Sequence, residues 1–258
     1  MVLVSLGIIG CGAIGSDVAM AADEMKEIGK IFLCDIKKER AEDLEKKLDK
    51  GCVADFADIL EESDIVFEAA SQEAVRQYAE RIVGRGKDLI IMSIGSLLDG
   101  GLLKRLREKA GKNKCKIYLP SGAVCGIDGI KAARGDVVDE VTLVTTKSPA
   151  SLGRELEKRT ILFDGAARDA VKEFPKNINV AACLSLAGIG FDKTKVKIVA
   201  DPVVRYNSHK ILAHGKFGRL RAEVENLPNP NNPKSSYLAS LSAIATLRRA
   251  INPIQIGA

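Results

Sequence analysis

The segment Val4-Ser5-Leu6-Gly7-Ile8-Ile9, continued by Gly10-Cys11-Gly12-Ala13-Ile14-Gly15, decides the fold class of this chain. Its first half has the apolar composition of a buried strand, and its second half fits the pattern G-x-G-x-x-G and opens a helix. In this context Gly10 permits a tight turn, Gly12 lets a pyrophosphate approach the backbone, and Gly15 allows the helix to pack closely on the strand. Because N–H groups at the start of the helix then face the anion, the segment predicts a dinucleotide-binding site.

An acidic residue follows where the ribose of such a dinucleotide would lie. Asp35 stands at the end of the second expected strand, about twenty residues beyond the glycine motif. An aspartate there accepts hydrogen bonds from the ribose hydroxyls and repels a 2′-phosphate, which favours NAD over NADP. Lys37 and Lys38 leave NADP open as a second cofactor, because one of them could pair with the phosphate; they fit an exposed first helical turn equally well.

Strand and helix patterns alternate as far as about Leu119, which is typical of βαβ units and a Rossmann-type parallel sheet. The expected strands lie near Val4–Ile9, Ile31–Cys34, Ile65–Glu68, Leu89–Ser93 and Lys116–Leu119. The expected helices lie near Ala13–Ile28, Lys38–Leu48, Gln72–Val83 and Leu98–Ala110. We therefore expect a dinucleotide-binding domain over residues 1–120.

After Pro120 the pattern changes to longer strands with partial alternation, which predict a mostly antiparallel sheet. These strands are expected near Glu140–Thr146, Lys195–Val204, His209–His214 and Gly218–Glu225. The helices are expected near Gly126–Arg134, Asn179–Leu186 and, after the break at Asn229–Pro233, Ser235–Ala250. We expect an α+β substrate and dimerisation domain over residues 121–234, with residues 235–258 packing back on the first domain.

The composition is that of an ordinary globular chain, with 258 residues of which 46% are hydrophobic and 28% charged. The net charge of +5 comes from interspersed residues and aromatic residues make up only 4%, which argues against a nucleic-acid partner. The six cysteines form no Cys-x-x-Cys pair, which argues against a metal site and fits the reducing cytoplasm. No segment is long and apolar enough to span a bilayer, so we expect no membrane association.

Four further segments lie where ligands could bind, and each has a competing structural interpretation. Glu68–Gln72 ends a strand at the carboxyl edge of the parallel sheet, although Ser71 could simply cap a helix. Ser93–Ser96 and Ser121–Gly126 are runs of small residues that would let a planar ring approach the backbone or would act as hinges. Lys176–Asn179 precedes an Ala-rich helix, so one of its two asparagines could cap that helix while the other binds a carboxamide.

The chain has two histidines, His209 and His214, on one expected strand. Because side chains alternate along a strand, the two point to opposite faces and at most one can line a given cleft. The unperturbed histidine pKa lies near neutrality, which makes a histidine the first candidate for proton transfer; a buried structural histidine is the alternative. Asn207 and Ser208 offer hydrogen-bonding neighbours to His209.

Taken together, these segments resemble the archaeal and bacterial L-aspartate dehydrogenase family over essentially the whole chain. The segments that carry the resemblance, in the order of the family, are Gly10–Gly15, Glu68–Gln72, Ser121–Asp128, Phe174–Ala182, Asn207–His209 and Asn232–Ala239. The run Ser93-Ile94-Gly95-Ser96 differs from the Ser-Thr-Gly-Ala of the family, a difference that concerns cofactor contacts rather than the reaction.

The resemblance implies oxidation of L-aspartate with NAD or NADP to iminosuccinate, which water converts to oxaloacetate and ammonia or which feeds NAD biosynthesis. It implies that His209 is the catalytic residue and that Ala123 and Asn179 contact the cofactor. The two carboxylates of such a dicarboxylate amino acid need cationic or N–H partners. By charge and neighbourhood, the candidates are Arg205, Lys176 and Lys234.

Two other kinds of protein remain as alternatives. A reductase of the homoserine dehydrogenase or dihydrodipicolinate reductase type would share the glycine motif, but should lack Phe174–Ala182 and Asn207–His209. A nonenzymatic NAD-sensing module would need a DNA-reading or partner-binding appendage, and the sequence contains no helix-turn-helix pattern or basic arm.

A homodimer is expected because few helices are available to cover the antiparallel sheet. Val141, Leu143, Val196 and Ile198 would then lie on an uncovered apolar face and pack on a second copy of the chain through a symmetric contact. The alternative is that the first domain or the last helix covers this face within one chain.

Overall fold

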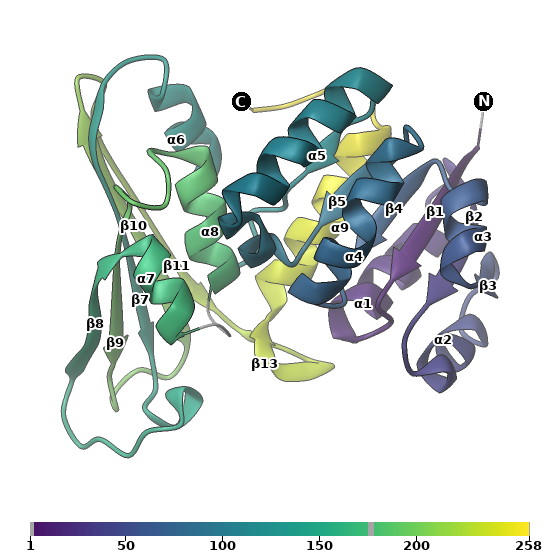
Figure 1. Ribbon diagram of the computed structural model, residues 1–258. Coiled ribbons are helices and arrows are strands. Elements are labelled where there is room, and N and C mark those ends of the chain that lie inside the picture. The colour runs from purple at the N-terminus through teal and green to yellow at the C-terminus, as the bar shows by residue number, and fades with distance from the viewer. Residues whose placement is uncertain (1–2, 175–177, 258) are drawn as a thin grey trace. The chain divides into compact units, whose positions relative to one another are not determined.

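The computed structural model describes residues 3–174 and 178–257, and the chain divides into two compact units. The first unit comprises Met1–Pro120 and Ser242–Gln255, and the second comprises Ser121–Leu241 and Ile256–Ala258 (Figure 1). The last helix, α9 (Tyr237–Ile251), begins in the second unit and ends in the first.

The first unit is built on a six-stranded parallel sheet with the strand order β3-β2-β1-β4-β5-β6. The strands are β1 (Val4–Ile9), β2 (Ile28–Cys34), β3 (Gly51–Val53), β4 (Ile65–Glu68), β5 (Asp88–Ile91) and β6 (Ile117–Tyr118). The intervening helices are α1 (Ala13–Asp23), α2 (Lys38–Glu45), α3 (Phe56–Glu62), α4 (Gln72–Gly84), the 3-10 helix η1 (Ile94–Leu98) and α5 (Gly100–Asn113). The predicted Rossmann-type sheet is confirmed, and its order reverses between β1 and β4, where ligands bind in such sheets.

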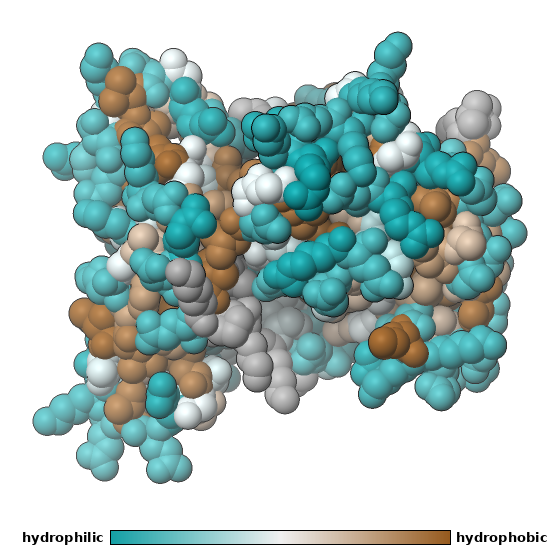
Figure 2. Space-filling model, viewed as in Figure 1, coloured by the Kyte–Doolittle hydropathy of each residue, from teal (hydrophilic) through white to brown (hydrophobic). Residues whose placement is uncertain are grey.

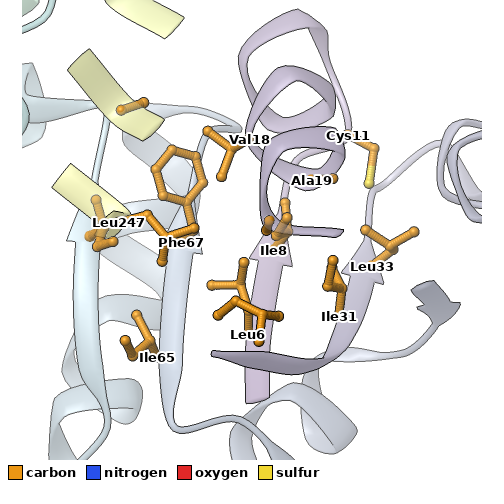
Figure 3. Close-up of a cluster of buried hydrophobic side chains, with 14 of the residues drawn as sticks. Leu6, Ile8, Cys11, Val18, Ala19, Ile31, Leu33, Ile65, Phe67 and Leu247 are labelled. Carbon is orange, nitrogen blue, oxygen red and sulfur yellow. The ribbon is translucent and has the colours of Figure 1, made fainter. Parts of the chain in front are cut away.

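The core of this unit lies between the sheet and the helices α1 and α9. One buried cluster contains Leu6 and Ile8 of β1, Phe67 of β4, Val18 of α1 and Leu247 of α9 (Figure 3). Each of these five side chains is fully buried. Because burial of a large apolar side chain stabilises a fold by roughly 1.5–3 kcal/mol, this cluster fixes β1 and α1, and with them the turn between the two.

Three details of the first unit differ from the expectation. Strand β3 was not expected, because three half-buried residues at the edge of the sheet give no periodic signal. Helix α3 was not expected either, although Asp55 and Asp58 form a capping box in which each carboxylate accepts the backbone N–H of the other. Helix α1 ends at Asp23 rather than near Ile28, because Ile28 already pairs with Val4 in the sheet.

The second unit contains a five-stranded sheet with the order β11-β10-β7-β9-β8. Its strands are β7 (Val138–Lys147), β8 (Thr160–Ala166), β9 (Lys195–Ala200), β10 (Asn207–Gly215) and β11 (Gly218–Asn226). Only β7 and β9 are parallel among these five strands, so the predicted mostly antiparallel sheet is confirmed. The helices are α6 (Ile127–Ala133), α7 (Ala167–Glu173) and α8 (Ile178–Ala187). Strand β8 and helix α7 were not expected.

One face of this sheet, here called the inner face, is covered by α6, α7 and α8 of the same unit (Figure 1). The packing is close, because a Cβ on Gly129 of α6 would lie 2.7 Å from Leu220 of β11. The expectation that four apolar strand residues lie uncovered is therefore wrong. These residues, all between 0% and 4% exposed, are Val141, Leu143, Val196 and Ile198.

The expected break before the last helix is an ordered turn. Strands β12 (Pro228–Asn229) and β13 (Asn232–Ser236) pair across it. Asn229 is fully buried, its Oδ1 accepts the N–H groups of Asn231 and Asn232, and its Nδ2 donates to the hydroxyl of Ser240. One asparagine thus closes the turn and connects it to α9.

The surface of the first unit is hydrophilic over α4 and α5 (Figure 2). There Glu80 of α4 accepts hydrogen bonds from Arg105 and Lys109 of α5, both at 2.8 Å. Within the described residues, no helix combines the length and the apolar composition that crossing a membrane requires.

Candidate functional site

The glycine motif joins β1 to α1, and each of its three positions is occupied by glycine for a different structural reason. Gly10 has a φ of +99°, and a Cβ there would lie 2.7 Å from the backbone of Ala69 and Ala70. A Cβ on Gly15 would collide with the carbonyl oxygen of Gly10. Gly12 differs from both, because a Cβ added there would meet nothing within 4 Å. Gly10 and Gly15 are thus required by the fold, whereas Gly12 keeps open the space in front of the helix.

The start of α1 has the features of a pyrophosphate-binding site. Gly12 is the N-cap of α1 and supplies no side-chain hydrogen bond to the helix, so Ala13 and Ile14 lie in a first turn without such a cap. The helix dipole at this end attracts an anion. These residues therefore fit the pyrophosphate of a dinucleotide.

Asp35 directly follows β2 and contacts the glycine turn. Its Oδ2 accepts the N–H of Cys11 at 2.8 Å, and its Oδ1 accepts the N–H of Lys37 at 2.8 Å. Each carboxylate oxygen can accept a second hydrogen bond. The structure thus brings Asp35 and the glycine turn together at the carboxyl edge of the sheet, as a ribose site requires.

Glu68 is a buried carboxylate that sequence reasoning named only as part of a segment. Its Oε1 accepts hydrogen bonds from the N–H groups of Ala70 and Ser71 and from the Ser93 hydroxyl, and its Oε2 accepts the Ser93 N–H. Burial raises the pKa of Glu68, while these donors lower it. Ser71 does cap α4 by accepting the N–H of Ala74. Glu68 thus joins the segments that follow β4 and β5.

His209 lies on the inner face of the second sheet and is 6% exposed. It stands directly opposite Thr145 of β7 on one side and Val224 of β11 on the other. The Thr145 hydroxyl, itself on a side chain only 4% exposed, lies 2.9 Å from His209 Nδ1. This bond leaves Nε2 as the ring nitrogen that can meet a ligand.

The environment of His209 strongly changes its proton affinity. Burial and the positive charge of Lys147 lower the pKa of His209 to about 3. Burial also lowers the pKa of Lys147, which is next but one to Thr145 on β7. The expectation that this histidine titrates near neutrality is therefore wrong for the protein without ligand. Its imidazole is neutral at pH 7 and a weak base until a bound ligand changes its surroundings.

His214 lies on the opposite face, as the spacing predicts. Its side chain is 51% exposed, with Nε2 3.5 Å from Glu140 and Nδ1 3.8 Å from Asp139. Solvent and these carboxylates surround it, so it lies apart from His209 and Thr145.

The segment before α6 is held to β11 by a side chain that sequence reasoning missed. Ala123 is 6% exposed, and its carbonyl accepts a hydrogen bond from Asn226 Nδ2 at 3.1 Å. Gly126 has a φ of +81° and lies so close to β11 that a Cβ there would be 2.9 Å from Ala222. The segment is therefore a packed loop in this structure.

Two of the remaining candidates, Asn179 and Arg205, lie at the surface. Asn179 is exposed in the first turn of α8, so it is not the cap of that helix. Arg205 is exposed before β10, with its guanidinium 5.3 Å from the centre of the Tyr206 ring. Lys176 and the side chain of Lys234 lie outside the described residues. Sequence reasoning did not name Thr145, Lys147 or Asn226, although polar residues at inward positions of β7 and β11 were a signal.

The described residues contain no group of three or more histidine, cysteine, aspartate or glutamate side chains that could hold a metal ion. All six cysteines are unpaired, and burial raises the pKa of Cys11 and of Cys183 to about 12. These two thiols are therefore protonated at neutral pH.

The parallel sheet with its glycine turn in the first unit, and the mixed sheet covered by helices in the second, form the architecture of a two-domain dehydrogenase of the Rossmann class. Residues 10–120 match the family model described as "Homoserine dehydrogenase, NAD binding domain", and residues 128–250 match "Aspartate dehydrogenase, C-terminal". The chain is 45% identical to an L-aspartate dehydrogenase of Methanosarcina barkeri, with 99% of this chain and 100% of that protein covered. It belongs to the L-aspartate dehydrogenase family, and it is an oxidoreductase with an NAD-binding domain.

Other comparisons agree with this assignment. The chain is 43% identical to an L-aspartate dehydrogenase of Methanothermobacter thermautotrophicus, with both chains fully covered. The crystal structure of aspartate dehydrogenase from Thermotoga maritima is similar with a TM-score of 0.83 and 30% identity, covering 98% of this chain and 99% of that one. A hyperthermophilic archaeal homoserine dehydrogenase in complex with NADPH shares the fold, with a TM-score of 0.61 and 13% identity.

Proposed function

We propose that the chain catalyses the oxidative deamination of L-aspartate. In this reaction L-aspartate, NAD⁺ and water give oxaloacetate, ammonium, NADH and a proton, by way of iminosuccinate. The observation that carries the proposal is the buried, neutral imidazole of His209, whose Nδ1 is bound by Thr145. In the cell, iminosuccinate could instead leave the enzyme and feed NAD biosynthesis before water attacks it.

In the proposed mechanism, His209 handles the proton that hydride transfer requires. When bound, NAD⁺ would supply the acceptor for the hydride on Cα of aspartate, and the electron pair on the amine nitrogen would then form the C=N bond of iminosuccinate. The amine must therefore be neutral first, and a neutral imidazole at His209 Nε2 can take its proton or a proton from the water that hydrolyses the imine. Thr145 keeps the ring in one orientation throughout.

Lys147 is the cation that we assign to a substrate carboxylate. Its charge acts on His209 directly, since it contributes to the low pKa of that ring. A carboxylate bound beside Lys147 would offset this charge and so raise the pKa of His209 above its value in the protein without ligand, although burial would still lower it. The dicarboxylate would thereby improve the base that acts on it.

The cofactor would bind to the first unit through Gly10, Gly12, Ala13, Ile14 and Gly15, with Asp35 at the ribose. The carboxylate of Asp35 supports a preference for NAD over NADP. Lys37 and Lys38 are exposed cations that follow Asp35 closely in the chain, so weaker use of NADP is also expected. Ala123 and Asn179 of the second unit are proposed to contact the nicotinamide end.

We further propose that the chain works as a homodimer in the cytoplasm, where its unpaired cysteines stay reduced. The face of the second sheet opposite to the inner face, here called the outer face, carries a hollow of about 770 Å³ lined in part by Glu140, Lys197, Leu212 and Arg221. It bears both signs of charge around an apolar centre, so two copies related by a twofold axis can pair opposite charges.

The experiment that tests the activity is a spectrophotometric screen of the purified chain. Amino acids with NAD⁺ or NADP⁺, and 2-oxo acids with ammonium and NADH or NADPH, are followed by the absorbance of the reduced cofactor. L-Aspartate and oxaloacetate should be the best substrates in the two directions. A faster reaction with homoserine, or no reaction with any amino acid, would overturn the proposal.

A further inference from the structure

Asn226, the last residue of β11, carries a buried acceptor atom to which the proposed mechanism assigns no partner. The side chain is 3% exposed, and its Nδ2 donates to the Ala123 carbonyl at 3.1 Å. Among the described residues, its Oδ1 has no hydrogen-bond partner. Folded proteins leave few buried polar atoms without one, so this oxygen points to a donor supplied by a ligand.

The orientation of the amide is fixed. If the amide were rotated by 180°, Oδ1 would face the carbonyl oxygen of Ala123, and two acceptors would meet. Oδ1 is therefore the atom available to a ligand, and the ligand must present an N–H or O–H group.

Asn226 is a near neighbour of His209. It pairs with Asn207 at the start of β10, and Val224, two residues earlier on β11, pairs with His209. Residues two apart on a strand point to the same face, so Asn226 and His209 both lie on the inner face. Diagonal neighbours of this kind are separated by about 7–8 Å, which allows both side chains to reach one small group between them.

We propose that Asn226 Oδ1 binds the amino group of the substrate by accepting a hydrogen bond from its nitrogen. This inference rests on the proposed aspartate dehydrogenase activity and deepens it. Of the polar groups of aspartate, ionised carboxylates cannot donate, whereas the amine has N–H groups and is the group on which His209 acts.

The proposed bond contributes to catalysis as well as to binding. As hydride leaves Cα, positive charge develops on the nitrogen, and its N–H becomes a charge-assisted donor. The bond to Oδ1 is therefore stronger in the transition state than with the neutral amine, which lowers the barrier. In the reverse direction the same oxygen would hold the incoming ammonia.

Two variants separate the roles of the two amide atoms. Asn226→Leu removes both, whereas Asn226→Asp keeps an acceptor oxygen and loses the donor to Ala123. The matched control is Asn113→Leu, because Asn113 Nδ2 donates to the Val83 carbonyl at 3.0 Å in the first unit. For each protein we would measure kcat and KM for aspartate, the inhibition constant of succinate, the Kd of NADH by fluorescence, and the melting temperature.

Succinate is the informative probe, since it has both carboxylates of aspartate and no amino group. We expect Asn226→Leu to lose roughly ten- to hundredfold in kcat/KM for aspartate, the range for a hydrogen bond to a charged group. Its succinate inhibition constant and NADH affinity should change by less than about threefold, and Asn226→Asp should keep clearly more aspartate activity than Asn226→Leu. Asn113→Leu should behave as the parent does.

Three results would overturn the inference. Equal losses in Asn226→Leu and Asn226→Asp, with succinate weakened as much as aspartate, would mean that Asn226 only holds Ala123. A loss confined to NADH affinity would assign the oxygen to the carboxamide of the cofactor. Full activity of Asn226→Leu would mean that water, and not the substrate, is the hydrogen-bond partner of Oδ1. If the parent chain oxidises another amino acid, the proposed substrate is wrong. The role of Asn226 is then tested in the same way, with that amino acid and its analogue without the amino group.

Discussion

Thr145→Val is the substitution that tests most sharply how the second unit prepares His209. Valine keeps the shape of threonine and the buried position on β7, and removes only the hydroxyl that lies 2.9 Å from Nδ1. Both side chains are at most 6% exposed, so water does not readily replace the lost partner. A buried polar atom left without its partner costs about 1–3 kcal/mol.

If that cost falls on the orientation of the ring in the transition state, kcat should decrease by roughly ten- to hundredfold. The KM for aspartate should change much less, because Thr145 is not expected to touch the substrate. Thr145→Ser, which restores a hydroxyl, should recover most of kcat. The assay is NADH formation from saturating aspartate, accompanied by thermal unfolding to identify variants that do not fold.

Thr142→Val provides a matched control on the same strand. Thr142 lies on the outer face, and its hydroxyl donates to Glu140 at 2.9 Å. This variant removes the same atoms from the same element and should retain the parent kcat within about twofold. Equal kcat values for Thr145→Val and Thr142→Val would refute the positioning of His209 by Thr145.

Three further outcomes are expected. Asp35→Ala should narrow the difference between NADH and NADPH affinity in fluorescence titrations, and equal affinities in the parent would contradict the role given to this carboxylate. Burial raises the pKa of Glu68 in the folded protein, so the folded state binds this proton more tightly than the unfolded state does. The stability of the parent relative to Glu68→Gln should therefore be greatest below pH 4.5 and fall as the pH rises above it. A stability difference that does not change with pH, measured by urea unfolding, would argue against this. Light scattering at low micromolar concentration should give twice the chain mass of 27.7 kDa, with Leu212→Arg on the outer face shifting the chain toward a monomer, whereas a monomeric parent would remove the dimer.

The sequence predicted the parts of the structure that depend on local periodicity. The turn at Gly10–Gly15 and the buried strands beside it follow from patterns that a single strand or helix contains. It also predicted that His209 and His214 lie on opposite faces, because alternation along a strand is a local property. Gly12 was expected to leave space for a pyrophosphate beside the backbone, because the G-x-G-x-x-G motif specifies a role for each of its glycines.

Properties that depend on distant packing could not be predicted in this way. The pKa of His209 depends on burial and on Lys147 of a neighbouring strand, and nothing near His209 in the chain indicates either. Val141 and Leu143 were expected to lie uncovered, but helices that precede and follow β7 in the chain pack on them. Thr145 became a candidate only when the strand register set it opposite His209.

Proton transfer by His209 is tested most directly by the kcat of the His209→Asn variant. Because the pKa of His209 without ligand is about 3, the rise of kcat/KM toward alkaline pH should come from the substrate amine and persist in the variant. We expect kcat to fall by roughly a hundredfold or more, NADH affinity to stay unchanged, and His214→Asn to retain most activity. A fully active His209→Asn protein, or a loss confined to His214→Asn, would contradict the account.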